Sequence, residues 1–318
     1  IAVNALGHNH PRVTEAIQDQ AENLLHASNI YYFEIQAKLS QLLVENTCAD
    51  KVFYANSGAE ANEGALKLAR KYFKKQGQDK YGIIATSKSF HGRTLATLAA
   101  TGQEKYQKPF TPLPKGFSFV PYNDLEAVKS EITDHTAAIM VEPIQGEGGV
   151  NPASLEYLEG LRNLCDKHNI LLIFDEVQTG IGRTGSLFAY QQYNIEPDIF
   201  TSAKALGNGV PVSALLARGD VADAFEPGDH ASTFGGNPLA CRAAYATMST
   251  ILEEDIISNV QNVGAYFKEK LIELQEKYDL VSNVKGRGLM LGVEVDIDPQ
   301  KIRDKMLEKG VCFWNFFI

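Results

Sequence analysis

Residues 198–209 read DIFTSAKALGNG: a short apolar run ends at Lys204, and a glycine-rich turn follows at once. Lysine side chains are rarely buried unless they have a partner or a function. An amine held against an apolar strand end has a lowered pKa, so it can attack a carbonyl as the neutral base and form a Schiff base. A lysine whose stem lies on the strand end while its ammonium reaches water is the ordinary alternative. The rest of the sequence has to decide between the two.

Apolar runs and helical patterns alternate on both sides of this stretch. Strands are expected at residues 51–54, 81–85, 117–120, 137–143, 170–174, 212–217 and 289–295, and helices at 11–25, 33–45, 58–72, 238–253, 257–278 and 299–309. The run at 170–174 is apolar throughout, which is typical of a strand buried on both faces in a parallel sheet. We therefore expect an α/β fold with a mainly parallel sheet, whose ligands bind beyond the carboxyl ends of the strands.

Asp175 comes directly after that apolar run. An aspartate in this position is suited to hold a cationic ring nitrogen. The alternatives are a helix cap, or a pair of metal-binding carboxylates formed with Glu176. Because successive strand residues point to opposite faces, the two side chains do not easily serve one metal ion.

Three other strand ends carry candidate binding groups. Small residues around Gly58 lie between a strand and a helix, where free N–H groups and the helix dipole favour a phosphate; a capping box of Ser57 and Glu60 is an equal alternative. Phe90 and Arg93 are suited to stack on a ring and to clamp a carboxylate, although a capping loop with a surface arginine explains them as well. Another strand ends in the carboxylate of Glu142. A lysine, an acid, an aromatic ring and a phosphate cradle at one sheet edge together describe a site for pyridoxal phosphate.

Residues 180–185, GIGRTG, match the G-x-G-x-x-G pattern of dinucleotide-binding turns. That turn should follow the first strand of its unit directly and lead into a helix. Here the acidic pair and three more residues intervene after a late strand. A nicotinamide dehydrogenase is therefore a minor alternative, and it leaves Lys204 unexplained.

The composition indicates a globular chain of about two domains: 318 residues, 44% hydrophobic and 22% charged. The net charge of −9 and the absence of a basic run argue against nucleic acid or membrane partners. No apolar run approaches the roughly 20 residues that span a bilayer, and no export leader is recognisable. His8 and His10 have no third ligand nearby, so no metal is expected. The four cysteines are far apart, which favours a reduced cytoplasmic protein, with two disulfides as the alternative.

Six blocks, in order, resemble the class III pyridoxal-phosphate-dependent aminotransferases. They are NSGAEANE at 56–63, FHGRT at 90–94, EPIQGE at 142–147, FDEVQTG at 174–180, AKALG at 203–207 and STFGGNP at 232–238. The likeness runs from Gly7 to about Val311. The last block and the run GIGRTGSLFAY at 180–190 look most like the acetylornithine enzymes of this family. Ornithine, succinylornithine and 4-aminobutyrate enzymes share most of the blocks and remain alternatives.

The resemblance implies a fold-type I transferase with a large and a small domain. It places an N-terminal segment that is part of the small domain at residues 1–30, a cofactor domain at 31–245 and an incomplete small α+β domain at 246–318. It also implies a cytoplasmic homodimer, a ping-pong cycle between the pyridoxal and pyridoxamine forms, and an amino group moved from N2-acetylornithine to 2-oxoglutarate in arginine biosynthesis.

The resemblance assigns roles to matching positions. Lys204 and Asp175 are implied to be catalytic, with Lys204 forming the Schiff base and Asp175 keeping the ring nitrogen protonated. The cofactor contacts implied are Gly58, Ala59, Phe90, Asp175, Glu176, Val177, Gln178, Lys204 and, across the dimer interface, Thr233. The substrate contacts implied are Arg93, Ser232, Glu142 and Glu147. Many relatives carry threonine where this chain has Ala59, so one phosphate-binding hydroxyl is missing.

The resemblance stops after Val311. The family continues there with strands and an arginine that holds a substrate carboxylate, whereas residues 312–318 read CFWNFFI. We expect Glu147 to lack the arginine with which it would pair, and we expect a chain truncated at both ends, whose cofactor binding is better assured than its turnover. A remnant that binds the cofactor without catalysis is therefore a further alternative.

Overall fold

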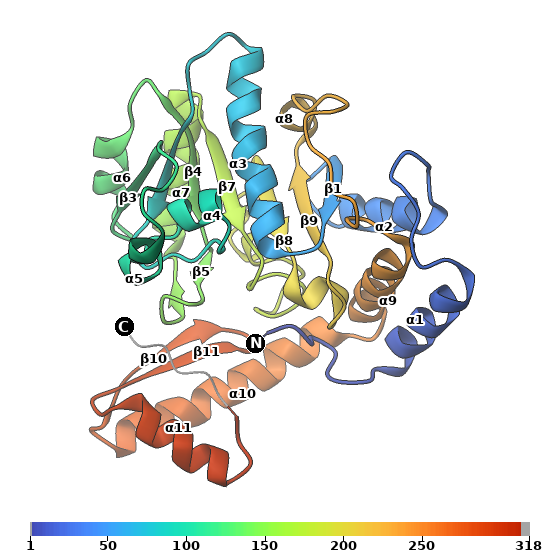
Figure 1. Cartoon of the computed structure of the whole chain (residues 1–318). Coiled ribbons are helices and arrows are strands. Elements are labelled where there is room, and N and C mark those ends of the chain that lie inside the picture. Colours follow the sequence, from blue (N-terminus) through green and yellow to red (C-terminus); the bar gives the residue numbers. More distant parts are fainter. Residues whose placement is uncertain (1, 313–318) are drawn as a thin grey trace.

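A seven-stranded sheet forms the centre of the computed structural model, which describes residues 2–312 (Figure 1). The strand order is β1-β9-β8-β7-β4-β2-β3. The strands are β1 Lys51–Ala55, β2 Gly82–Thr86, β3 Phe117–Val120, β4 Thr136–Val141, β7 Leu171–Asp175, β8 Ile199–Ser202 and β9 Ser213–Ala217. Neighbours from β8 across to β3 pair in parallel, and β9 is antiparallel to both β1 and β8. The expected α/β fold with a mainly parallel sheet is confirmed.

The exception at β9 follows from the length of its connection. Only residues 203–212 separate β8 from β9, and they contain the short turn η3, Lys204–Gly207. A parallel neighbour needs a crossover of a dozen or more residues, so the chain returns in the antiparallel direction. The lysine stretch therefore forms a tight turn at the carboxyl end of β8.

Helices cover both faces of the sheet. On one face, α3 (Gly58–Lys75) packs against β8 and β9, and its buried side chains join those of the strands in one apolar cluster. On the other face lie α2 (Glu34–Glu45), α7 (Leu155–His168) and α9 (Pro238–Glu253). Every residue of β4 and β7 is buried, as the apolar run at 170–174 predicts for a strand covered on both faces.

A smaller unit follows α9 and lies beyond the carboxyl edge of the sheet (Figure 1). It consists of α10 (Ile256–Lys277), the antiparallel hairpin β10 (Val281–Arg287) and β11 (Met290–Val295), and α11 (Pro299–Glu308). It contacts the loop after β4: Met290 packs with Ile144 and Val150, and Lys285 Nζ donates to Asn151 Oδ1 at 2.7 Å. Residues 313–318, most of the aromatic C-terminal run, lie outside the described residues.

The expected boundary between residues 245 and 246 falls inside α9, which continues to Glu253. We propose instead that the large domain ends at the turn between α9 and α10. The helix α1 (Pro11–Asn23) packs on α9, so the N-terminal segment contacts the end of the large domain.

The remaining elements are short and lie in the connections. They are α4 Leu95–Ala100, α5 Glu104–Gln107, η1 Lys108–Phe110, α6 Leu125–Glu131, β5 Ile144–Gln145, β6 Asn151–Pro152, η2 Ala189–Gln192 and α8 Gly219–Ala222. Residues 180–185 form turns that precede η2, and no helix begins on them. Gln261 Nε2 of α10 donates to Gly185 O at 2.6 Å, so this segment joins the smaller unit to the large one. Because no helix begins on residues 180–185, the alternative of a dinucleotide-binding turn is wrong.

No helix in the described part of the chain is long and apolar enough to cross a membrane. Residues 2–312 also hold no group of three or more His, Cys, Asp or Glu side chains arranged for a metal ion. Within the same residues all four cysteines are free thiols, so the alternative of two disulfides does not apply to this structure.

Candidate active site

A cavity of about 430 Å³ opens where β7 and β8 end and α3 begins. We call it the central cavity. The predicted site residues that line it are Gly58, Ala59, Phe90, Arg93, Glu142, Glu147, Asp175, Val177, Gln178 and Lys204. Segments more than 100 residues apart in sequence thus meet at the carboxyl edge of the sheet, as a parallel α/β fold predicts.

Asp175 ends β7 and points into a buried network of hydrogen bonds. Its Oδ2 accepts from Asn62 Nδ2 and lies near His91 Nδ1, each at 2.8 Å, and its Oδ1 accepts from Val177 N at 3.0 Å. Thr201 on β8 donates to Asn62 Oδ1 at 2.7 Å and so orients the amide. The carboxylate is 4% exposed and is held from three elements, which fixes its direction in the cavity.

Asn62 and His91 are functional residues that the sequence prediction missed. Asn62 lies four residues after Gly58, on the same face of α3, and it is buried. An asparagine between the small residues Ala61 and Gly64 of this helix was the sequence feature that could have indicated it. Burial lowers the pKa of His91, but the hydrogen bond and charge of Asp175 outweigh it and raise the pKa overall. His91 Nε2 is buried and has no hydrogen-bond partner in the described chain.

Lys204 lies in the left-handed region, with φ of +46°, directly after β8. This backbone conformation is strained for a residue with a side chain, and such strain tends to occur at functional sites. Burial lowers the pKa of Lys204, and the carboxylates of Asp175, Glu147 and Glu142 oppose this only in part. The pKa of Lys204 is therefore lowered, in the direction that the sequence predicts for an amine at this strand end.

The N-terminus of α3 forms another wall of the central cavity. Ser57 Oγ accepts from Glu60 N at 3.3 Å, and Glu60 Oε2 accepts from Asn56 N at 3.0 Å. The capping interpretation is thus confirmed. The cap provides an acceptor for the N–H group of Glu60, whereas the N–H groups of Gly58 and Ala59 remain at the positive end of the helix. A Cβ on Gly58 would lie 2.8 Å from Val177 Cγ1, so only glycine fits between this helix and the segment after β7.

Arg93 is exposed at the mouth of the cavity and stacks on aromatic rings. Its guanidinium carbon lies 4.4 Å from the ring centroid of Tyr106 and 5.5 Å from that of Phe90. The two rings meet edge to face at 5.8 Å. Tyr106 is a further residue that the motifs did not indicate. The aromatic pair orients Arg93 while leaving its N–H groups for a carboxylate.

Glu142 and Glu147 both line the cavity, but Glu142 is already engaged. Its carboxylate accepts from Phe90 N and Gly146 N, each at 3.0 Å, and so ties together two loops of the site. Burial raises the pKa of this carboxyl group. Glu142 thus has an evident structural task, and its predicted contact with substrate remains a prediction.

Ser232 and Thr233 lie outside the lining of the central cavity. Ser232 Oγ accepts from Asn56 Nδ2 at 3.2 Å and from Gly235 N at 3.0 Å, which places it next to the N-terminus of α3. Thr233 is exposed. Neither predicted role is tested within one chain.

The structure corrects the prediction for Glu176. Its side chain is fully buried and turns away from the cavity, because its carboxylate accepts from Thr179 Oγ1, from Ala189 N at 2.9 Å and from Tyr190 N at 2.8 Å. Alternation along an extended segment sends the side chains of Asp175 and Glu176 to opposite sides. The side chain of Glu176 therefore holds the segment at 189–190 and does not line the central cavity.

Replacing Glu176 with alanine should destabilise the fold without a specific loss of cofactor affinity. Two buried N–H groups and a hydroxyl would lose their acceptor, and we expect the free energy of unfolding to fall by about 3 kcal/mol. Glu176→Gln retains one acceptor oxygen and should cost about half as much. Urea denaturation of the three proteins measures this. A variant of wild-type stability with weakened cofactor binding would restore Glu176 as a contact.

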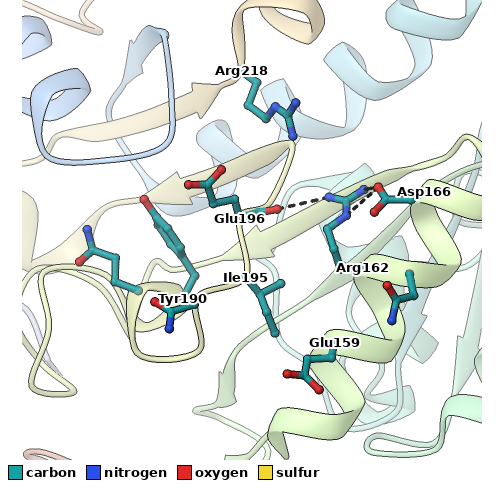
Figure 2. Close-up of a pocket in the computed structure, with 10 residues that line it drawn as sticks. Glu159, Arg162, Asp166, Tyr190, Ile195, Glu196 and Arg218 are labelled. Carbon is teal, nitrogen blue, oxygen red and sulfur yellow. Dashed lines mark hydrogen bonds and ion pairs between the residues drawn. The ribbon is translucent and has the colours of Figure 1, made fainter.

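A second cavity, of about 730 Å³, lies between α7 and residues 190–196 (Figure 2). It is near the amino ends of β7 and β8, at the opposite edge of the sheet from Lys204. The guanidinium of Arg162 is already bonded to Asp166, Asp198 and the carbonyl of Glu196, as Figure 2 shows in part. Because this cavity lies at the amino edge of the sheet and its Arg162 is already paired with carboxylates, it is not the candidate active site.

The fold and the central cavity define a transferase of the class III aminotransferases, and the chain belongs to that family, which matches it over residues 1–317. It is 55% identical to an acetylornithine aminotransferase of Methanocaldococcus jannaschii over 98% of this chain and 78% of the relative. It also resembles the solved N-acetylornithine aminotransferase of Stenotrophomonas maltophilia, with a TM-score of 0.84 and 38% identity over 98% of this chain and 79% of the other. The ornithine aminotransferase of Toxoplasma gondii, with PLP partly occupying its active site, gives a TM-score of 0.93 and 38% identity over 98% and 76%.

The enzymes of this family depend on pyridoxal phosphate, and the residues present fit that group. The cradle beside Gly58 would be closed by any Cβ, Lys204 approaches with an amine of lowered pKa, and Asp175 presents a braced carboxylate. When bound, the cofactor supplies a reactive aldehyde and a ring that withdraws electrons from the substrate carbon.

Proposed function

We propose that the protein transfers the terminal amino group of N2-acetylornithine to 2-oxoglutarate, giving N-acetylglutamate 5-semialdehyde and glutamate in arginine biosynthesis. The observation that carries this proposal is the meeting of Lys204, Asp175 and the N-terminus of α3 in one cavity. The choice of donor is supported by the identity of 55% to an acetylornithine aminotransferase over nearly the whole chain.

Each wall of the cavity has a separate task in this reaction. The N–H groups of Gly58 and Ala59 bind the phosphate at the positive end of α3. Asp175 holds the protonated ring nitrogen, with Asn62 and His91 fixing its carboxylate. Phe90 and Val177 would hold the ring between them, and Gln178 would bind its hydroxyl group. Lys204 Nζ would take the proton from the substrate carbon that bears the amino group, as general base, and would then deliver it to the cofactor carbon, as general acid.

The substrate meets the cavity at its mouth. Arg93, stacked on Tyr106, binds a carboxylate, and Glu142, Glu147 and Ser232 complete the substrate contacts. The donor and 2-oxoglutarate use the same cavity in turn, so the kinetics are ping-pong.

We further propose that the active form is a cytoplasmic homodimer in which Thr233 of one subunit binds the phosphate group of the cofactor held by the neighbouring subunit. Thr233 is exposed and adjoins Ser232, which is bonded to the α3 N-terminus through Asn56. The buried free thiols of Cys165 and Cys241 suit a reducing compartment.

A comparison of amino donors tests the proposed substrate. The chain loaded with pyridoxal phosphate is supplied with 2-oxoglutarate and N-acetylornithine, ornithine, N-succinylornithine or 4-aminobutyrate, and glutamate is measured. We expect the highest kcat/KM with N-acetylornithine. A higher value with another donor would reassign the enzyme within the family, and cofactor binding without glutamate from any donor would identify a catalytically inactive protein.

A further inference from the structure

We call residues 204–208 the lysine turn. Its last residue, Asn208, forms hydrogen bonds with the N-terminal segment of the chain. It follows η3 with φ of +44°, a left-handed conformation that asparagine tolerates better than most residues. The turn between β8 and β9 therefore carries two residues in this conformation, Lys204 at its start and Asn208 at its end.

Three hydrogen bonds join Asn208 to residues about 200 positions earlier in the chain. Leu6 N donates to Asn208 Oδ1 at 3.0 Å, Asn208 Nδ2 donates to Gly7 O at 3.2 Å, and Asn4 Nδ2 donates to Asn208 O at 3.2 Å. A side-chain amide that both accepts from and donates to one backbone segment fixes the position and direction of that segment. We call residues 3–7 the strap.

The strap also contributes to the central cavity. Val3 lines it, together with Val210, Pro211 and Val212, which connect the lysine turn to β9. These four residues are apolar lining of a cavity whose lining also contains the charged groups of Asp175, Glu142 and Glu147. The approach is close, since a Cβ on Gly209 would lie 3.3 Å from Asn4 Nδ2. Figure 1 shows the N-terminal segment running along the carboxyl edge of the sheet, above the smaller unit.

We propose that Asn208 is a positioning residue that holds the strap against the lysine turn, so that Val3 completes an apolar wall for the aliphatic part of the amino donor. The ligand recognised by this wall is an ω-amino acid derivative with a chain of methylene groups. The inference rests on the proposed function for the identity of the donor, but the hydrogen bonds between Asn208 and the strap exist independently of it.

Hydrogen exchange on the chain without cofactor tests the positioning step. In Asn208→Gly the left-handed backbone is retained and only the side chain is lost, so we expect the amide of Leu6 to exchange about ten-fold faster. Asn169→Gly is the matched control, because Asn169 also has a positive φ, of +49°, and precedes β7 at the opposite edge of the sheet. Unchanged protection of Leu6 in Asn208→Gly would overturn the proposal.

Donor kinetics test the consequence for specificity. Loss of one or two methylene contacts changes kcat/KM by about ten-fold or more, so we expect Asn208→Gly to raise KM for N-acetylornithine by about that factor with a smaller change in kcat. Asn208→Asp still accepts from Leu6 but repels Gly7 O, and it should give an intermediate KM.

The outcomes of the two experiments separate the inference from the proposed function. If Leu6 loses protection but the KM of the best donor is unchanged, the strap is positioned by Asn208 without forming the donor wall, and the inference fails. If another donor proves best, the proposed function is revised and the same KM comparison is made with that donor. A loss of cofactor absorbance in Asn208→Gly would assign Asn208 to the lysine turn itself and also overturn the inference.

Discussion

Replacing Lys204 with alanine is expected to abolish turnover, lowering kcat by at least about a thousand-fold. Lys204 is proposed both to bond to the cofactor and to move the substrate proton, and a positioned acid–base group alone contributes about 10²–10⁴-fold. The absorbance band of the bound cofactor that depends on the lysine should disappear in the same variant. Absorbance spectra with pyridoxal phosphate, and glutamate formation with N-acetylornithine, are the two measurements.

Lys88→Ala is the matched control for this experiment. Lys88 also follows a strand, β2, and also has a positive φ, of +66°, but it does not line the central cavity. Both variants therefore replace a lysine of strained backbone with alanine, and only one removes an amine from the site. Equal losses of activity in the two would mean that the turn geometry matters and that the amine does not, which would remove Lys204 from the mechanism.

The sequence predicted the sheet well because its strands carry a strong local signal. The run at 170–174 and the run before Val141 are apolar on both faces, so burial from two sides could be inferred without knowing their neighbours. β10 was missed because five of its seven residues are polar or glycine, without regular alternation, and only Gly286 is buried. The helix α7 was also missed, although Ser154 and Asn169 provide ordinary capping signals at its two ends.

The sequence predicted the position of site residues that lie at strand ends. It predicted less well the roles of residues whose partners come from distant loops. Lys204 and Asp175 are brought together by parallel strands, which topology alone implies. Glu176 was misassigned because its partners, Thr179 and the N–H groups at 189 and 190, depend on how the following loop folds. The link between Asn208 and the strap joins segments about 200 residues apart, and no local pattern indicates it.

The second large effect is expected for Asp175→Asn, which keeps the shape of the side chain and removes its charge. We expect kcat to fall by about 10²–10³-fold, a loss comparable to that of one electrostatic partner of the reacting group. The amide oxygen can still accept from Asn62 Nδ2 beside His91, so the fold around β7 should persist, although the amide nitrogen cannot accept from Val177 N as Asp175 Oδ1 does. Steady-state glutamate formation by the cofactor-loaded protein measures the loss.

The same substitution has a consequence that can be measured without cofactor. Burial lowers the pKa of His91, and the Asp175 carboxylate, with a smaller contribution from Glu142, raises it overall. With asparagine at 175 the burial remains and the carboxylate is gone, so the pKa of His91 should fall, and the imidazole should stay neutral to lower pH than in the wild type. An NMR titration of the histidine in both proteins follows this directly.

Asp198→Asn serves as the matched control for Asp175→Asn. Asp198 is also a buried acid beside β8, but it lies at the amino end, where it pairs with Arg162 and accepts from Leu172 N at 2.7 Å. This variant should lose stability, because Arg162 loses one of its two carboxylate partners and keeps only Asp166, while its folded fraction keeps wild-type kcat and an unchanged His91 pKa. If both variants lowered kcat equally, the effect of Asp175 would be one of stability. A reduced kcat in Asp175→Asn alone, together with the shifted His91 titration, would show that the charge of Asp175 acts in the reaction. The comparison is informative because both acids are buried next to a parallel strand and differ in the edge of the sheet at which they lie.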